Sequence, residues 1–438
     1  MINRRITYVI FATPLIITLY FWLTTTGLDL TSSASILISI GRLMGLITAY
    51  FVLIQFVLRG RIMPLEKIFG YELLNKIHKK IGLYLTAFLI SHPMLLTLGY
   101  SMQGKINPIS QYIQFITIYE NVWLAFIGYI TFLLIIFSSI YIVRNKLRYE
   151  FWYIVHLAVY IAVLLSFFHQ FSVGTDFLLN KWFSYYWYLM YFIVFAITIY
   201  TRFIVLILRF KKHRFYIDKV IKETDDTISL FIKGVNLKSF HFEPGQFLFV
   251  RFLSKELGKE SHPFSFSSIP NAEYLRITIK KEGDFTEKLM RIKSGTKLLI
   301  DGPHGAFTER FMKKDKILFI AAGVGITPIR SIIESIGNNK QQILFYSNKT
   351  SSDIIFKKEL DNLSQKYNFP IYYVISREET YKGIKGRIDL NLIKQYVSNL
   401  MEFDIYICGP NAMAKNITHE LKSSGVHPSQ IHFEEFVL

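Results

Sequence analysis

Six long apolar stretches dominate the first half of this 438-residue chain. They cover residues 6–26, 36–58, 80–101, 120–143, 152–172 and 185–208. Each is close to the roughly 20 apolar residues that a helix needs to cross the hydrocarbon core of a bilayer. We therefore expect a membrane α-helical six-helix bundle. The first stretch follows Arg4 and Arg5 as a signal peptide would, but it lacks a small-residue cleavage site, so we expect it to be retained.

The distribution of positive charge predicts how these helices are oriented. The formal net charge is +18, and lysine and arginine concentrate near the N-terminus and in every second connection between the stretches. The alternate connections contain only Lys105 and Lys181. By the positive-inside rule, we expect both termini in the cytoplasm and the helices among membrane lipid, in the plasma membrane. Nucleic-acid binding is the competing explanation of a basic chain, but these charges lie at helix ends rather than on one surface, so we expect no such partner.

Four histidines lie in the third and fifth stretches, where a titratable ring is costly and indicates function. His78 and His92 are fourteen residues apart, and His156 and His169 are thirteen apart. Both stretches cross the membrane in the same direction, so each contributes one inner and one outer histidine, at levels about 20 Å apart. Neutral imidazole is an axial ligand of haem iron, so we expect two stacked haems, each held by one histidine from each helix. For any single histidine, the alternative is a hydrogen-bonded packing residue.

The spacing of the second histidine pair predicts an irregular helix. Fourteen residues make about 3.9 turns, but thirteen make only about 3.6, so His169 would turn away from His156 on a regular helix. We therefore expect local unwinding or a π-bulge between them. Arg42, in the outer half of the second stretch, needs a counter-charge, and the propionates of the outer haem are one candidate. The alternative for Arg42 is snorkelling to the outer interface.

The second half of the chain has the pattern of two water-facing domains. After Arg214, five short apolar runs with Gly- and Pro-rich connections predict a small antiparallel β-barrel. From Lys316, strand-like runs alternate with helical segments, which predicts an α/β domain with a parallel sheet. We therefore expect a transmembrane domain at 1–212, a β-barrel domain at 213–312 and an α/β domain at 313–438.

A glycine-rich segment of the expected α/β domain is a candidate nucleotide site. In AAGVGITPIRS, Gly323 and Gly325 lie between a predicted strand and a predicted helix, where they would let the backbone approach a pyrophosphate. Thr327 and Pro328 begin the helix, whose N-terminal amides attract an anion. A Gly-x-Gly pair alone is often only a turn, so the prediction depends on this strand–loop–helix context.

Two further segments contain candidate ligand-binding positions. In GDFTEKL, Gly283 and Thr286 precede a predicted helix and are candidates for a second pyrophosphate. Cys408, Gly409 and Pro410 follow a strand at the carboxyl edge of the predicted sheet, where ligands bind in open α/β folds. The alternative for Cys408 is a small buried filler. Because it is the single cysteine, no intrachain disulfide is possible.

Together these features resemble the ferric reductase and NADPH oxidase family over nearly the whole chain. The signature is a histidine opening the third stretch, another fourteen residues later, then FWYxxHL and a histidine thirteen residues later. The resemblance implies two b-type haems, the inner held by His78 and His156 and the outer by His92 and His169. The soluble half is similar to ferredoxin–NADP reductases, so residues 213–312 would bind FAD and residues 313–438 NADPH or NADH.

The resemblance also assigns residues to the soluble cofactors. HPFSFSS resembles the family's flavin motif, with His262 and Pro263 followed by Phe264 and Ser265 against the isoalloxazine ring. Three residues would hold the FAD pyrophosphate: Lys280, Gly283 and Thr286. The GVGITP and CGP segments would hold the pyridine nucleotide, with Cys408 near the nicotinamide.

The resemblance extends to the choice of nucleotide, with two departures elsewhere. YSNKT resembles a loop that recognises a 2′-phosphate, so Lys349, helped by Arg377, favours NADPH over NADH, although surface solvation would also explain these cations. Leu96 occupies a position where animal oxidases have a further histidine, which weakens an argument for oxygen chemistry. Phe436 is the candidate for the family's terminal aromatic over the flavin, but two residues follow it.

The resemblance implies electron transfer from cytosolic NADPH through FAD and two haems to an external acceptor. An oxidase would reduce oxygen to superoxide near Arg42, whereas a metalloreductase would reduce ferric or cupric ions. The outer segment GYSMQGKINPISQY has no histidine and no acidic cluster to bind a metal, which favours oxygen. The third alternative is an electron-transfer module for a membrane partner. No calcium-binding loop is visible, so we expect no obligatory protein activator.

Overall fold

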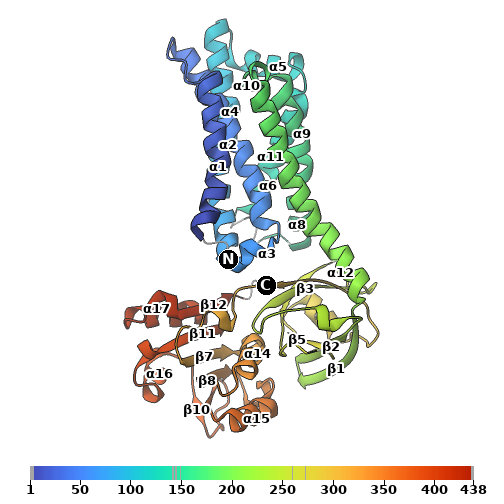
Figure 1. The fold of residues 1–438 in the computed structure, drawn as a ribbon, viewed down its shortest axis with the longest axis vertical. Coiled ribbons are helices and arrows are strands. Elements are labelled where there is room, and N and C mark those ends of the chain that lie inside the picture. The colour runs from blue at the N-terminus through green and yellow to red at the C-terminus, as the bar shows by residue number, and fades with distance from the viewer. Residues whose placement is uncertain are drawn as a thin grey trace. The chain divides into compact units, whose positions relative to one another are not determined.

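The computed structural model describes residues 4–140, 143, 146–147, 149–258, 260–271 and 273–435. The chain divides into two compact units (Figure 1). The first contains Met1–Ile68 and Leu73–Arg202, and the second contains Phe69–Glu72 and Phe203–Leu438. Each unit has its own hydrophobic core, so each is described separately below.

Long apolar helices form the first unit. Among the described residues, six helical segments are long and apolar enough to cross a membrane, which agrees with the six predicted stretches. The described helices of this unit are α1 (Arg4–Thr25), α2 (Ser33–Arg59), α3 (Met63–Phe69), α4 (Tyr71–Gly104), α5 (Pro108–Ile118), α6 (Val122–Ser139), α8 (Tyr149–Leu157), α9 (Val159–Ser172), α10 (Thr175–Leu179) and α11 (Lys181–Ile199). Helix α12 (Val205–His213) follows in the segment Phe203–Leu438 of the second unit.

The exposed surface of this unit is as apolar as its core. Phe183 and Trp187 of α11 are completely buried, and they pack with Leu53 of α2 in one cluster. Leu83 of α4 and Phe192 of α11 are 75% and 70% exposed on the outside of this unit. Helices that are apolar on every face suit a lipid environment rather than water.

The predicted irregularity between His156 and His169 is present, as an interruption of the helix rather than a π-bulge. Helix α8 ends at Leu157 and α9 begins at Val159. At Ala158, the N–H donates to the carbonyl of Val155, 3.1 Å away, which is the tighter i→i−3 pattern. A π-helix does occur elsewhere, at Tyr200–Ile204 between α11 and α12.

The first part of the second unit has two antiparallel sheets around one core. Their strand orders are β1-β2-β5 and β4-β3-β6, and isolated bridges join the edges of the two sheets. The sequence predicts five of these strands and identifies HPFSFSS only as a motif, although its first four residues form β4. The elements are β1 (Tyr216–Thr224), β2 (Thr227–Lys233), β3 (Phe247–Phe252), β4 (His262–Ser265), β5 (Leu275–Lys280), α13 (Asp284–Leu289) and β6 (Leu298–His304).

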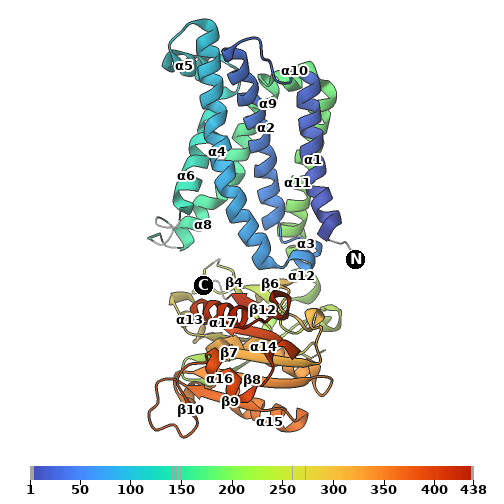
Figure 2. The ribbon, with the colours of Figure 1, turned by 90° about the vertical axis from the view of Figure 1, so that its left-hand side faces the viewer.

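A six-stranded parallel sheet follows, in the order β10-β9-β8-β7-β11-β12 (Figure 2). Helices α14 and α15 belong to one apolar cluster and α16 and α17 to the other, so each face of the sheet is covered by two helices. This is the predicted α/β architecture. Its elements are β7 (Lys316–Ala322), α14 (Ile326–Ile336), β8 (Gln341–Asn348), α15 (Lys357–Tyr367), β9 (Ile371–Ile375), β10 (Ile384–Lys385), α16 (Leu390–Tyr396), β11 (Phe403–Gly409), α17 (Asn411–Ser423) and β12 (Ile431–Glu435).

Candidate functional site

The structure brings His78 of α4 and His156 of α8 next to each other in an edge-on arrangement. Their ring centroids are 6.2 Å apart, and the ring planes are inclined by 61°. One metal ion between two imidazoles requires a similar separation, because each metal–nitrogen bond is about 2 Å long and each ring centre lies about 1 Å behind its nitrogen. Nδ1 of His156 lies 3.4 Å from the Ser139 hydroxyl, which leaves Nε2 for coordination. The inner pair therefore fits one shared metal ion.

His92 is oriented in the way that metal-binding histidines usually are. Its Nδ1 lies 2.8 Å from the carbonyl oxygen of Gly41 on α2. A proton on Nδ1 that is donated to this carbonyl leaves Nε2 as the free nitrogen, and such a bond orients a coordinating ring. His169 of α9 is close enough to His92 for the two rings to interact electrostatically.

A glycine allows this close approach of α2 to His92. A Cβ atom at Gly45 would lie only 2.6 Å from Cε1 of the His92 ring. Gly41 and Gly45 have the four-residue spacing that lets membrane helices approach closely. Among the described residues, no group of three or more His, Cys, Asp and Glu could hold a metal ion by protein ligands alone. Two ligands per level suit a haem, in which the porphyrin supplies the other four donors.

Arg42 has counter-charges within the protein itself. Its Nη2 lies 3.5 Å from the Tyr100 hydroxyl, and its charge interacts with Asp29 and Asp176. Asp176 is 4% exposed and accepts a 2.6 Å hydrogen bond from Thr26. Burial raises the pKa of Asp176, although the Thr26 bond and the Arg42 charge oppose this shift. The position of Arg42 therefore does not by itself require a haem propionate.

The flavin motif predicted from the sequence begins with an edge strand. Ser265 in β4 is buried, Phe264 and His262 are half-buried, and Pro263 is exposed. The His262 ring stacks on Phe285 of α13 with centroids 3.8 Å apart, and its Nε2 lies 3.0 Å from a Glu260 oxygen. Because alternate side chains of a strand share a face, His262 and Phe264 lie on the same side of β4 and form a partly open aromatic surface.

The three residues predicted for the FAD pyrophosphate are largely engaged with the protein. Lys280 ends β5 and pairs with Asp226 at 3.3 Å. The Thr286 hydroxyl accepts the N–H groups of Glu282 and Gly283, at 2.9 and 3.0 Å. A Cβ atom at Gly283 would have no neighbour within 4 Å, so this turn leaves open space beside its backbone. The space beside Gly283 is therefore the open part of this predicted set, although the N–H of Gly283 is already donated to Thr286.

The predicted nucleotide loop lies between the two strands where the order of the parallel sheet reverses. Gly323 follows β7 with φ +54°, and a Cβ atom there would meet nothing within 4 Å. A Cβ atom at Gly325 would lie 2.2 Å from the Cys408 carbonyl oxygen at the end of β11. Ligands of open α/β sheets bind at such a reversal. The loop therefore has an open side at Gly323 and a side at Gly325 that packs directly on the neighbouring strand.

Most other side chains predicted at this edge are buried. Thr327 is 1% exposed and donates to the Val324 carbonyl at 2.9 Å, and Pro328 is also buried, so these two residues build the loop. Gly409 packs against Met413, and Pro410 precedes α17. The thiol of Cys408 is completely buried, and burial, followed by the charge of Glu434, raises its pKa. This environment favours the packing alternative for the cysteine.

Cations and carboxylates are mixed at the loop predicted to recognise a 2′-phosphate. Lys349 and Arg377 are exposed after β8 and β9, and the Arg377 N–H donates to the Lys349 carbonyl at 2.8 Å. The sequence analysis missed Glu378, whose oxygens accept from the N–H and the hydroxyl of Ser351, at 2.6 and 3.1 Å. At this position of a dinucleotide fold, an acidic side chain suits a ribose 2′-hydroxyl and a cation suits a 2′-phosphate.

Phe436, the predicted terminal aromatic over the flavin, lies outside the described residues. Trp152, which the sequence analysis missed, packs on His156 with ring centroids 5.1 Å apart and donates to Ser139 at 3.2 Å. Its position four residues before His156, on the same helix face, is the sequence signal that would have identified it.

Family models match three successive parts of the chain, one in the first unit and two in the second. Residues 44–167 match the ferric reductase like transmembrane component, residues 214–308 an FAD-binding domain, and residues 319–419 an oxidoreductase NAD-binding domain. The chain thus joins a region similar to ferric reductase transmembrane components to FAD- and NAD-binding oxidoreductase domains. The matched ranges contain three of the four histidines, both glycines of the nucleotide loop and the flavin motif, while His169 lies two residues beyond the first range.

Known relatives share parts of this arrangement. A superoxide-generating NADPH oxidase heavy chain of Dictyostelium discoideum is 28% identical over 309 residues, which are 66% of this chain and 42% of that protein. The glycine betaine monooxygenase reductase of Pseudomonas aeruginosa is 29% identical over 233 residues, covering 50% of this chain. The chain thus spans less than two thirds of the length of these curated relatives, 62% in the second case. The soluble half also aligns with a ferredoxin NADP+ reductase from Neisseria gonorrhoeae (21% identity, TM-score 0.46, 52% of this chain and 99% of that chain).

Proposed function

We propose that this oxidoreductase carries electrons from cytosolic NADPH through FAD and two b-type haems to oxygen outside the cell, giving superoxide. The observation that carries this proposal is the pair of adjacent imidazoles at His78 and His156, at a separation suited to one shared metal ion. The name of the Dictyostelium relative supports NADPH as donor and superoxide as product. FAD accepts a hydride and haem iron carries single electrons, so the cofactors together turn a two-electron donor into one-electron steps.

The residues of the chain bind and orient these groups in the proposed mechanism. Helix α4 provides one ligand at each level, His78 and His92, while α8 and α9 provide His156 and His169. Donation from Nδ1 of His92 to Gly41 fixes which ring nitrogen faces the metal. Strand β4 presents the half-buried ring of Phe264, and the open side of Gly323 receives the nucleotide pyrophosphate. Both termini face the cytoplasm in this proposal, as the distribution of lysine and arginine predicts.

A ferric or cupric reductase is the second candidate, because the membrane half matches a ferric reductase like model. The donor is also open between two nucleotides: the NADH-cytochrome b5 reductase 2 of Candida glabrata is another relative, 29% identical over 227 residues. An electron-transfer module that serves a membrane partner is the third candidate, and it would reduce neither oxygen nor ferric chelate efficiently without that partner.

The deciding experiment supplies NADPH to the purified, haem- and FAD-loaded protein with either of two acceptors. A superoxide oxidase reduces cytochrome c in air, and superoxide dismutase abolishes that reduction. A metalloreductase instead reduces ferric chelate under argon at an undiminished rate, insensitive to dismutase. The second result would replace our proposal with the metalloreductase. A preparation without Soret absorbance, or with far fewer than two haems per chain, would overturn both.

A further inference from the structure

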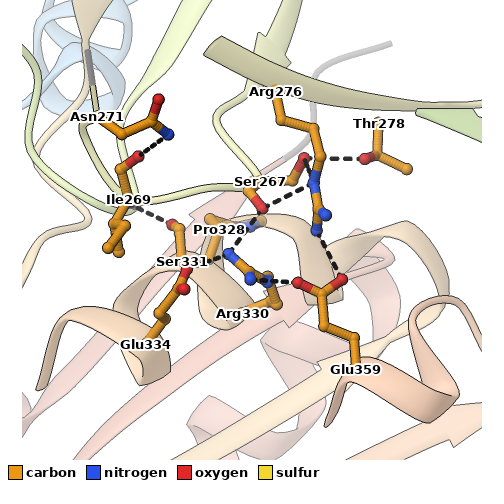
Figure 3. A network of polar contacts seen from close by, with 11 residues as sticks. Ser267, Ile269, Asn271, Arg276, Thr278, Pro328, Arg330, Ser331, Glu334 and Glu359 are labelled. Carbon is orange, nitrogen blue, oxygen red and sulfur yellow. Dashed lines mark hydrogen bonds and ion pairs between the residues drawn. The ribbon is translucent and has the colours of Figure 1, made fainter. Parts of the chain in front are cut away.

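Two buried arginines share one carboxylate in the second unit. Arg276 of β5 and Arg330 of α14 are each 6% exposed. One oxygen of Glu359, in the first turn of α15, lies 3.0 Å from Nη2 of Arg276, and the other oxygen pairs with Nη2 of Arg330 (Figure 3). We call Arg276, Arg330 and Glu359 the arginine clamp. It joins the region of the two antiparallel sheets (β1 to β6) to the region of the parallel sheet (β7 to β12).

The arginine clamp also holds the turn that follows the flavin strand. The Ser267 carbonyl accepts from Nε of Arg276 and from Nη1 of Arg330, both at 3.1 Å. The Ser267 hydroxyl bonds Thr278 at 2.9 Å, which fixes the same turn to β5. Ser267 lies two residues after Ser265, which the sequence analysis assigned to the flavin. One carbonyl beside the candidate flavin surface is thus held from both regions.

On its other side, the arginine clamp reaches the candidate nucleotide loop. Arg330 lies within about one helical turn of Thr327, at the N-terminal end of α14 that follows the Gly323–Gly325 loop. The next residue, Ser331, accepts the N–H of Gly245 at 3.0 Å, which is a second bond between the regions. Phe356, just before α15, packs on the Arg276 guanidinium at 4.5 Å.

The energetics of buried ion pairs favour a positional role for this network. Replacing such a pair by apolar residues is often neutral or stabilising, so a buried ion pair is weak evidence for stability. Charge-assisted hydrogen bonds do fix geometry here, because each guanidinium contacts both the Ser267 carbonyl and the Glu359 carboxylate. Hydride transfer depends strongly on geometry, since a misplacement of about 1 Å can cost about 100-fold in rate.

We propose that the arginine clamp positions the nucleotide loop against the flavin turn, so that the nicotinamide and the isoalloxazine meet at transfer distance. Glu359 is the positioning residue at its centre. This inference rests on the proposed function only for the identity of the two rings. The bonds that carry it are all within the second unit.

The test compares two variants with the same change of charge. Glu359→Gln breaks the bridge to Arg276, whereas Glu334→Gln removes the partner of Arg330 that lies on its own helix. Full-length, FAD-loaded protein is mixed rapidly with NADPH under argon. We expect Glu359→Gln to lower the limiting rate of flavin reduction about tenfold with unchanged NADPH Kd and FAD content. Glu334→Gln should stay within about twofold of the unchanged protein.

A second measurement does not depend on activity. In flavin-free full-length protein, we expect Glu359→Gln, but not Glu334→Gln, to speed amide hydrogen exchange in segments 264–269 and 323–330. Equal limiting rates or equal exchange in the two variants would overturn the positioning role of the arginine clamp, as would a change confined to NADPH Kd.

If Glu359→Gln does not fold, Arg276→Lys is the second variant, because it keeps the charge but loses the planar guanidinium. An unchanged limiting rate in Arg276→Lys would overturn the inference. If the unchanged protein shows no flavin reduction, the proposed function fails instead, while hydrogen exchange still decides the arginine clamp.

Discussion

At the scale of single residues, a missing side chain decides where His92 can lie. Gly45 faces the His92 ring so closely that one added carbon would occupy the space of the ring. Gly82 is on α4 and faces Gln55 of α2, where an added Cβ atom would meet its nearest neighbour at an ordinary 3.5 Å. The two glycines therefore differ in the room beside them, although both lie within helices.

We expect Gly45→Ala to displace the His92 ring and to lower haem content from two per chain to about one, without loss of FAD. Gly82→Ala is the matched control, and it should keep both haems because alanine fits there and is a better helix former by about 1 kcal/mol. Soret absorbance and iron per polypeptide measure the outcome. Full haem content in Gly45→Ala would contradict the assignment of His92.

A single carboxylate is the residue-scale feature that affects the choice of nucleotide. Glu378 occupies the Ser351 donors that a 2′-phosphate could use, and its charge would repel that phosphate. We expect Glu378→Gln to raise the NADPH/NADH ratio of kcat/KM about fivefold, as loss of about 1 kcal/mol of repulsion predicts. The exposed neighbour provides the control Glu379→Gln, and tighter binding of 2′,5′-ADP is the second readout. A ratio that stays the same or falls would place the 2′-position elsewhere.

At the scale of elements, the interruption at Ala158 sets the rotation of α9 relative to α8. Each residue of a helix turns about 100°, so one residue added or removed re-aims everything beyond it. His156 lies before the interruption and His169 after it. The four-residue spacing of Trp152 and His156 is unaffected, since both lie within α8.

Deletion of Ala158 should therefore turn His169 away from its present direction relative to His156, and the protein should bind one haem fewer. Deletion of Val173, which follows α9 and lies beyond both histidines, is the control for a shortened chain. Absorbance spectra of the reduced protein report the haems. Two haems in the Ala158 deletion would show that the interruption does not set the geometry of the pair.

The β1–β2 connection gives an element whose stability depends on pH. Burial raises the pKa of Asp226, but hydrogen bonds from Thr224 and Thr227 and the charge of Lys280 together outweigh it, so the pKa lies below 3.8. A depressed acid pKa stabilises the fold above the unfolded value, and this stabilisation disappears as pH falls through the folded value. Asp226→Asn should therefore lower Tm at pH 7, and the difference should shrink as pH falls below about 4 and vanish below the folded pKa of Asp226. Asp225→Asn, at an exposed neighbour, should change Tm little at either pH.

At the scale of the whole molecule, the two units perform separable parts of the proposed reaction. All four histidines lie in the first unit, and the flavin and nucleotide candidates lie in the second. Each unit has its own core, so a lesion in the first need not disturb the second.

We expect His169→Ala to remove one haem and to stop reduction of an external acceptor, while NADPH still reduces the flavin at its usual rate. His419→Ala, at an exposed histidine of α17, is the control and should change neither. Rapid-mixing absorbance separates flavin reduction from haem reduction. Loss of flavin reduction in His169→Ala would contradict this division of labour.

The sequence by itself determined the architecture of both units, because apolar length and periodicity are local properties. Runs of about 20 apolar residues are long enough to cross a membrane as helices, and the strand–loop–helix order at Gly323 is typical of a nucleotide-binding fold. The spacing of His156 and His169 even required an irregular helix, which Ala158 provides. The short strand β4 was missed because its four residues are too few to show a period.

Only the tertiary structure decided which groups meet across the fold. Glu359 is 83 residues from Arg276, and no local sequence pattern shows that its carboxylate binds both Arg276 and Arg330. The same holds for Glu378 beside Ser351, and for Asp29 and Asp176 near Arg42. Burial also depends on packing, so the thiol of Cys408 and the side chain of Thr327 look available in the sequence and are enclosed in the fold. Contacts between distant segments have an entropic cost of loop closure, which only the packing of the whole core offsets. They are therefore set by the tertiary structure rather than by neighbouring residues.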